Sequence, residues 1–302
     1  MPTPVLLEAA INGTTTRDRN PNVPRTPAEI TADALACIEA GASLVHNHTD
    51  DPIFDGMTAA HSPTPYIEAW RPVLDEHPDA FLYPTMTGGG PHTTVEQRYG
   101  HLPAIARAGC LTMGIVDPGS VNIGTFDPDG QPSTHDLVYQ NSNADVRYMI
   151  DTCDALAVPI NFSIFDGSFM RTAAAYIRAG RVRHGGIVKI FFGAPYSSFG
   201  IPATEASLAA YLEMLEGCDL PWSIAIPGGD LLGSDIAGLA LERGGHLRIG
   251  LEDYAGPGTP TNVELVERAE KLCREVGRPI ARGAEAAKRM KVPASSVRRG
   301  RA

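Results

Sequence analysis

The feature that most constrains the fold is a regular alternation of short apolar runs with helix-like segments along the whole chain. Eight runs have the length and the apolar, β-branched composition of buried strands, namely residues 4–11, 43–48, 81–87, 110–116, 159–165, 187–192, 222–227 and 247–252. Helical patterns follow them at about residues 27–41, 65–76, 95–109, 143–157, 168–179, 204–216, 233–243 and 262–277. Eight strand–helix pairs predict an α/β protein, a (β/α)₈ TIM barrel. A doubly wound open sheet is the alternative, because a strand count does not establish closure.

The chain has 302 residues, a length at which α/β barrels form one domain, and 43% of them are hydrophobic. We therefore expect a single barrel domain over residues 1–291 and a flexible basic tail over residues 292–302. The segment 117–141 is rich in Gly, Pro and Asp, which predicts a long functional loop after the fourth strand.

The formal net charge of −10 argues against a nucleic-acid partner or an anionic membrane surface. No apolar run approaches the roughly 20 residues that span a bilayer, and the N-terminus lacks a signal-peptide pattern, so we expect no membrane association and a cytoplasmic protein. The five cysteines are scattered singly, which predicts reduced thiols and no thiolate zinc site.

Two histidines end the second predicted strand, in the sequence SLVHNH. Strand side chains alternate in direction, so His46 and His48 share one face. Two neutral imidazoles at this spacing can chelate one divalent ion, and the carboxyl ends of barrel strands form the active site. The alternative is a pair of hydrogen-bonded histidines at the barrel mouth.

The eighth predicted strand ends with Arg248, Glu252 and Asp253. In a closed barrel this strand is separated from the second strand only by the first. Glu252 is therefore placed to complete a His₂Glu metal set that leaves coordination positions open, as catalytic sites require. The alternative is a solvated acidic turn.

The third predicted strand ends in TMTGGG. Thr85 and Thr87 share one face of this strand, and the glycines Gly88, Gly89 and Gly90 let backbone N–H groups approach an anion closely. The sequence thus predicts an anion contact here, with a flexible turn as the alternative.

The chain resembles the β-keto acid cleavage enzymes, the family of the 3-keto-5-aminohexanoate cleavage enzyme. The resemblance runs nearly end to end and rests on TPAEITADALACIEAGASLVHNH, TGGG, PGSVNIG and GGHLRIGLED followed by TNVELVERA and GRPIA. It implies a (β/α)₈ barrel with a divalent metal, generally zinc. It also implies an acyltransferase that reacts a 3-oxo acid with the co-substrate acetyl-CoA, giving acetoacetate and an acyl-CoA, in a homo-oligomer expected to be a tetramer.

The resemblance also assigns site residues by position. Asp253 is expected to take the C2 proton, with Arg248 orienting it, while the metal polarises the keto oxygen. The assigned residues are His46, His48 and Glu252 as metal ligands, Arg248 and Asp253 as the catalytic pair, and Thr85, Thr87, Gly88, Gly89 and Ser120 as substrate-binding residues.

Several positions depart from the family pattern. The family commonly carries two carboxylates on the fifth strand, where this chain has Asn161 and Ser163, and it tends to Gly-Arg after the seventh strand, where this chain has Pro227 and Gly228. The loop NGTTT after the first strand lacks the Glu that reads a substrate amine. We therefore expect a neutral or anionic 3-oxo acid, because an ammonium group has no evident counter-charge.

Two other functions are compatible with a metal-binding barrel. An amidohydrolase also uses a His-x-His pair, but on the first strand and with histidines after the fifth and sixth strands, which end here in SIFD and IFFG. The other alternative is a barrel that binds a metal and an acyl ligand without turnover.

Overall fold

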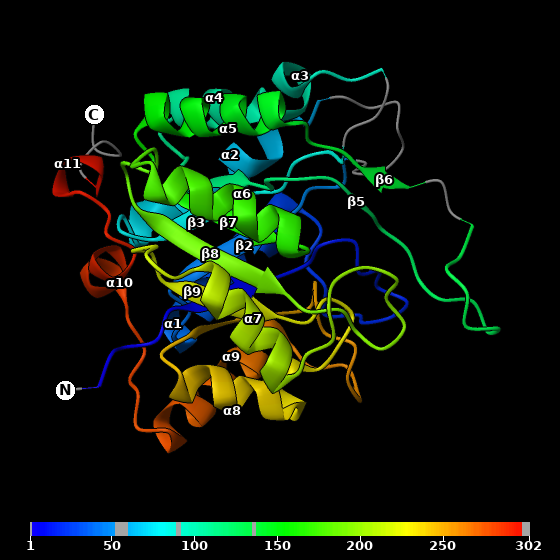
Figure 1. The fold of residues 1–302 in the computed structure, drawn as a ribbon. Coiled ribbons are helices and arrows are strands. Elements are labelled where there is room, and N and C mark those ends of the chain that lie inside the picture. The colour runs from blue at the N-terminus through cyan, green and yellow to red at the C-terminus, as the bar shows by residue number, and fades with distance from the viewer. Residues whose placement is uncertain (1, 52–59, 89–91, 135–136, 298–302) are drawn as a thin grey trace.

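A computed structural model describes residues 2–51, 60–88, 92–134 and 137–297, and eight parallel strands form a nearly closed barrel in it (Figure 1). The strands follow the order β3-β2-β1-β10-β9-β8-β7-β4. Their bounds are β1 Leu7–Ala10, β2 Leu44–Asn47, β3 Phe81–Pro84, β4 Gly114–Val116, β7 Ile160–Ile164, β8 Gly186–Phe191, β9 Trp222–Ala225 and β10 His246–Ile249. The predicted TIM barrel is confirmed.

Helices interleave with the strands and cover the outside of the barrel (Figure 1). Their bounds are α1 Pro27–Ala40, α2 Thr64–Glu76, α3 Val95–Tyr99, α4 His101–Arg107, α5 Asn143–Leu156, α6 Gly167–Arg178, α7 Glu205–Met214, the 3₁₀ turn η1 Leu231–Gly233, α8 Asp235–Glu242, α9 Asn262–Glu275, α10 Gly283–Arg289 and α11 Ala294–Val297. Helix α1 follows the N-cap Thr26 and ends before Gly41, close to the predicted range 27–41.

The structure corrects several predicted boundaries. The single helix predicted over residues 95–109 is two helices, α3 and α4, on either side of Gly100. The predicted loop 117–141 contains a short antiparallel hairpin, β5 (Val121–Asn122) with β6 (Val138–Tyr139). Helices α10 and α11 were not predicted; α11 lies inside the predicted tail, and residues 298–302 lie outside the described residues.

The seam between β3 and β4 closes through a side chain. In the part of the chain that the structure describes, no backbone ladder joins these two strands. Instead, the Thr112 hydroxyl lies 2.7 Å from the backbone N of Leu82 and 3.2 Å from its backbone O. A side-chain hydroxyl that both accepts and donates substitutes for one ladder residue, and this explains why the predicted strand 110–116 is shorter in the structure.

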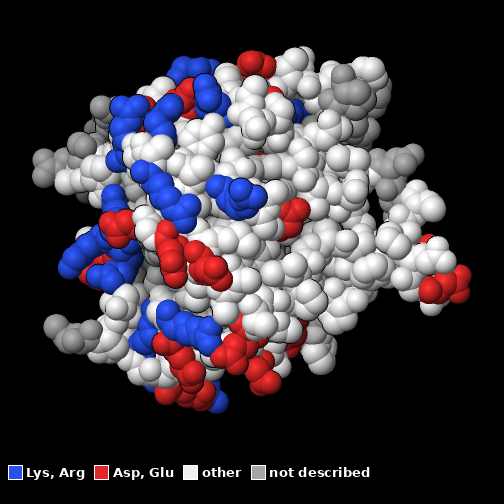
Figure 2. Space-filling model, in the orientation of Figure 1, with Lys and Arg blue, Asp and Glu red and all other residues white. Residues whose placement is uncertain are grey.

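Surface charge of both signs is mixed over the helices on the face shown in Figure 2. Lys271 with Glu275, and Arg274 with Glu270, are examples of ion pairs along α9. All five cysteines are free, as predicted. None of the helices in the described ranges is both long and apolar enough to span a membrane.

The barrel interior is occupied by buried charge where apolar side chains would be usual. Glu8 on β1, Lys189 on β8 and Arg248 on β10 are each 1% exposed. Glu8 Oε1 lies 2.9 Å from Arg248 Nη1 and 3.7 Å from Lys189 Nζ. It also accepts a hydrogen bond from the Tyr83 hydroxyl, while its Oε2 accepts one from Asn161 Nδ2 at 2.9 Å. One carboxylate thus satisfies two buried cations.

These contacts determine the ionisation of Glu8. Burial alone would raise the pKa of this carboxyl, but Lys189, Arg248 and the Tyr83 hydroxyl together lower its pKa from 4.5 to about 2. Because the ionised form is favoured in the folded state, Glu8 stabilises the fold fully above pH 4.5, and that stabilisation is lost as the pH falls toward 2.

We predict that Glu8→Gln lowers the free energy of unfolding at pH 7 by about 3 kcal/mol, because the buried Lys189 loses its carboxylate and Arg248 loses one of three. The difference from the wild type should shrink as the pH falls below 4.5. Urea denaturation between pH 7 and pH 3 measures both effects. The control is Glu275→Gln, which removes an exposed ion pair and should cost less than about 1 kcal/mol. Equal stability of wild type and Glu8→Gln would show that neutral hydrogen bonds suffice in the barrel.

Candidate active site

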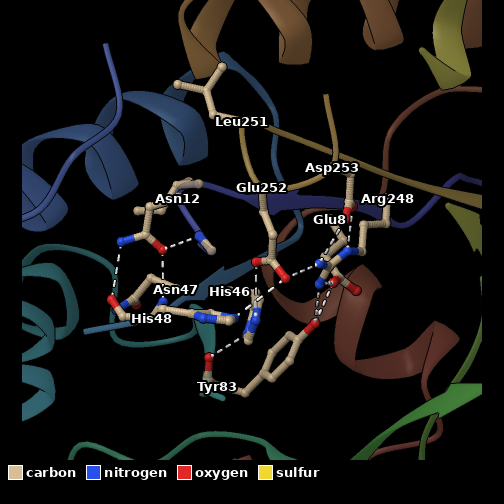
Figure 3. Close-up of polar contacts among 12 residues, drawn as sticks. Glu8, Asn12, His46, Asn47, His48, Tyr83, Arg248, Leu251, Glu252 and Asp253 are labelled. Atoms are coloured by element: carbon tan, nitrogen blue, oxygen red, sulfur yellow. Dashed lines mark hydrogen bonds and ion pairs between the residues drawn. The ribbon is translucent and has the colours of Figure 1, made fainter. Parts of the chain in front are cut away.

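Three predicted metal ligands converge at the carboxyl ends of β2 and β10 (Figure 3). One nitrogen from each of His46 and His48 and one carboxylate oxygen of Glu252 all lie within 4.8 Å of one another. His46 Nε2 is 3.3 Å from Glu252 Oε2, and His48 Nε2 is 3.4 Å from Glu252 Oε1. β1 lies between β2 and β10, as the sequence predicts, and brings these residues together.

The orientation of His46 fits a metal ligand. Its Nδ1 lies 3.1 Å from the backbone carbonyl oxygen of Tyr83, which can only accept, so Nδ1 carries the proton. Burial lowers the pKa of His46 well below its usual value and keeps the ring neutral. Nε2 therefore presents a lone pair to Glu252 Oε2, which has no hydrogen-bond partner among the described residues. Two lone pairs that face each other in a buried site are the donor arrangement that a divalent cation fits.

The loop after β1 holds the other two ligands in place. Asn12 Oδ1 accepts the backbone N–H of His48 at 2.8 Å, and Asn12 Nδ2 donates to the His48 carbonyl at 3.1 Å. Gly13 has a φ of 54°, and a Cβ on it would lie 2.2 Å from Glu252 Cγ. Only glycine lets this loop pack so closely against the Glu252 side chain.

The chain bends at Gly250, and this bend directs both Glu252 and Asp253 toward the barrel axis. The sequence predicts a continuous strand to residue 252. Instead, β10 ends at Ile249, and Gly250 has a φ of 136° with its backbone against the Ala10 carbonyl oxygen. The backbone N–H of Asp253 donates to the Gly250 carbonyl at 3.2 Å. The kink therefore precedes the two carboxylates rather than following them.

Arg248 connects the metal set to the second carboxylate (Figure 3). Its Nε and Nη2 bind Asp253 Oδ2 and Oδ1 at 2.7 and 3.2 Å, a bidentate pair. Its Nη2 also lies 2.7 Å from Glu252 Oε1. Burial raises the pKa of Asp253 above its usual value, although Arg248 opposes that shift. A carboxylate with a raised pKa is a stronger base.

A cavity of about 190 Å³ opens beside these groups. Thr85, a predicted substrate-binding residue, lines it together with His46, His48, Arg248, Glu252 and Asp253. The other lining residues are Thr14, Met86, Ile115, Asp117, Ile123, Tyr139, Ser163, Phe165, Lys189, Phe191, Phe199 and Pro227.

The remaining predicted substrate-binding residues lie outside that lining. Thr87 is buried, and the Gly88 carbonyl accepts the backbone N–H of Gln140 at 2.9 Å. Ser120 is exposed, and its hydroxyl exchanges hydrogen bonds with the backbone of Asn141. Gly89 lies outside the described residues. The structure thus brings together the metal set, the Arg248–Asp253 pair and Thr85.

Sequence analysis missed Glu8, Lys189 and Asp117, all of them buried. Each follows or interrupts an apolar run, as in VLLEAAI, IVKIFF and GIVD. A single charged residue within a strand that is buried on both faces must be paired, so these interruptions are the available signal.

Curated relatives match almost the full chain. A 3-keto-5-aminohexanoate cleavage enzyme from Acetoanaerobium sticklandii is 29% identical over 93% of this chain and 96% of its own length. A 3-oxoadipate:acetyl-CoA acetyltransferase from Cupriavidus necator is 29% identical over 98% of both chains. An apo structure of ObcA is similar in fold, with a TM-score of 0.67 and 17% identity over 90% of this chain and 66% of that one.

A protein-family comparison covers the barrel from its first strand to the residues just after α10. The sequence pattern of the beta-keto acid cleavage enzymes matches residues 4–292, and the chain therefore belongs to the beta-keto acid cleavage enzyme family.

Proposed function

We propose that this enzyme converts a 3-oxo acid and acetyl-CoA into acetoacetate and a new acyl-CoA. The bond between C2 and C3 of the 3-oxo acid breaks, the C1–C2 unit joins the acetyl group, and the remaining acyl group is transferred to CoA. The observation that carries the proposal is the buried set of His46, His48 and Glu252, next to the Arg248–Asp253 pair and open to a 190 Å³ cavity. The names of the curated relatives, which include two acetyl-CoA transferases, support it.

The residues have separate tasks in this reaction. His46, His48 and Glu252 would hold a divalent ion, zinc by its preference for two histidines and one carboxylate. When bound, the ion supplies Lewis-acid stabilisation of negative charge on the keto oxygen. Asp253 takes the proton from C2, and the bidentate contact with Arg248 fixes the orientation of its carboxylate. Thr85 offers a hydroxyl to the substrate at the same end of the cavity.

The test is a panel of 3-oxo acids incubated with acetyl-CoA, with acetoacetate and the new CoA ester both quantified by mass spectrometry. We expect equal amounts of the two products. Hydrolysis of a substrate without a CoA ester would favour the hydrolase alternative. Binding without any turnover would favour the non-catalytic alternative.

We predict that the purified enzyme retains one divalent ion per chain and that His48→Ala weakens zinc binding by roughly 100-fold or more, because one of three ligands is lost. Elemental analysis and competition with a chromogenic chelator measure this. The chain offers a matched control in His77→Ala, because Glu39, Glu76 and His77 form a second group of similar composition on the surface. Loss of the ion in His77→Ala, with retention in His48→Ala, would move the metal site to that surface group.

We predict that Asp253→Asn lowers turnover by roughly 10²–10⁴-fold, the usual contribution of a general base, while the bound metal and the fold are retained. Steady-state kinetics, metal content and thermal melting measure the three quantities. Asp230→Asn is the control, since Asp230 lies on the same rim but does not line the 190 Å³ cavity. If the folded Asp253→Asn enzyme keeps near-normal turnover, Asp253 only supports the rim of the barrel.

A further inference from the structure

Asp117 lines the cavity with a carboxylate on the side opposite Arg248. It directly follows β4, which in the order of strands around the barrel stands opposite β10, the strand of Arg248. The side chain is 4% exposed and lines the cavity. Its Oδ2 accepts a hydrogen bond from the Tyr139 hydroxyl, whereas the buried Oδ1 has no partner in hydrogen-bond geometry within the described ranges, although Ser163 lies near enough to lower the pKa of this carboxyl.

The backbone around Asp117 is fixed, so this carboxylate has little freedom to turn away. Asn141 Nδ2 donates to the Asp117 carbonyl at 3.0 Å, and Tyr139 belongs to strand β6 of the hairpin. A buried polar atom without a partner costs free energy, which a ligand in the cavity can recover.

The two cations that line the cavity are already matched by other carboxylates. Lys189 is paired with Glu8, and Arg248 with Glu8, Glu252 and Asp253. Among the residues that the structure describes, no basic side chain lies within ion-pair distance of Asp117. Asp117 therefore makes no direct ion pair: burial raises the pKa of its carboxyl, and Lys189 and Arg248 lower that pKa only from a longer distance.

Aromatic rings line the same cavity as this carboxylate. The ring of Phe165 lies 5.8 Å from that of Tyr139, 4.9 Å from Phe191 and 6.0 Å from Phe199, measured between centroids. All four side chains line the cavity. The ring of Phe191 already faces Lys189 at 5.1 Å and Arg248 at 5.2 Å. Aromatic faces together with a carboxylate are the chemistry that recognises organic cations, including methylated ammonium groups.

We propose that Asp117, Tyr139, Phe165 and Phe199 form an ammonium pocket that binds a cationic group of the 3-oxo acid, on the side of the keto carbon away from its carboxylate. This inference rests on the proposed function and specifies its substrate class. It replaces the sequence-based expectation of a neutral or anionic 3-oxo acid, whose premise was that no counter-charge faces the substrate. Asp117 supplies that charge and determines specificity, while proton transfer remains with Asp253.

Two pairs of substrates that differ only in charge test the ammonium pocket. The primary amine 5-amino-3-oxohexanoate is compared with 5-methyl-3-oxohexanoate, and 3-oxo-4-(trimethylammonio)butanoate with 5,5-dimethyl-3-oxohexanoate. We expect kcat/KM to favour the cation by roughly 30-fold or more in at least one pair, and the pair that responds distinguishes a primary from a methylated ammonium group. Efficient turnover of both neutral substrates without preference for either cation would overturn the ammonium pocket and leave the proposed function intact.

The variant Asp117→Asn keeps the size of the side chain and an oxygen that can accept from Tyr139. We expect the ratio of kcat/KM for the cation to kcat/KM for its neutral partner to fall by roughly 10-fold or more, and thermal melting shows whether the variant is folded. The control is Asp129→Asn. Asp129 is an exposed residue of the loop 117–141, so this substitution changes the net charge equally and should leave the preference for the cation unchanged. An undiminished preference in Asp117→Asn would contradict the assignment.

A binding measurement keeps the inference testable if no substrate turns over. The 3-hydroxy acids lack the keto group needed for cleavage, so 3-hydroxy-4-(trimethylammonio)butanoate and 3-hydroxy-5,5-dimethylhexanoate are compared by calorimetry. The metal-loaded wild type should bind the cation more tightly, and Asp117→Asn should lose that difference. Absence of CoA-ester formation from every 3-oxo acid would reject the proposed function, whereas equal binding of the two hydroxy acids would reject the ammonium pocket.

Discussion

The ion pairs of the Arg248 guanidinium are the interactions on which the rest of the barrel interior depends. It is 1% exposed and bonds Glu8, Glu252 and Asp253, so it joins the interior charge network to the candidate metal set and to the candidate base. Removing a buried charge of this kind leaves its partners uncompensated, which costs far more than an exposed ion pair. The positions of all three carboxylates therefore follow from one side chain on β10.

The barrel can be stable with a polar centre because its apolar packing lies elsewhere. Apolar packing comes from the outer faces of the strands against the helices, as with Leu7 and Val45, which are almost completely buried. The inward positions then need not supply hydrophobic stabilisation, only a balance of charge. Lys189 and Arg248 face Glu8, Glu252 and Asp253, so ionised carboxylates outnumber cations around the site. A divalent cation on the His46 side would more than offset that excess of negative charge.

The sequence predicted the barrel and the metal set because both depend on periodic, local patterns. Strand alternation places His46 and His48 on one face, and strand order then brings Glu252 to them. The bend at Gly250, inside the predicted strand 247–252, was not predicted, because the close packing of Gly250 against the Ala10 carbonyl is a tertiary contact. The ion-pair partners of the buried Glu8 and Lys189 depend on which strands face each other across the barrel and on how far the strands are staggered. A local sequence pattern contains neither piece of information.

The β10 side and the β4 side of the cavity differ in how many interior contacts a substitution would disturb. On the β10 side, a change at Arg248 disturbs three carboxylates at once, so the chemistry can vary little without loss of the fold. On the β4 side, the carboxylate of Asp117 is held mainly by the Tyr139 hydroxyl of a short hairpin. Substitution there changes what the cavity recognises and leaves the direct ion pairs of Lys189 and Arg248 in place. A barrel built in this way can exchange one 3-oxo acid for another through β4 and its hairpin, while β1, β2 and β10 keep the reaction.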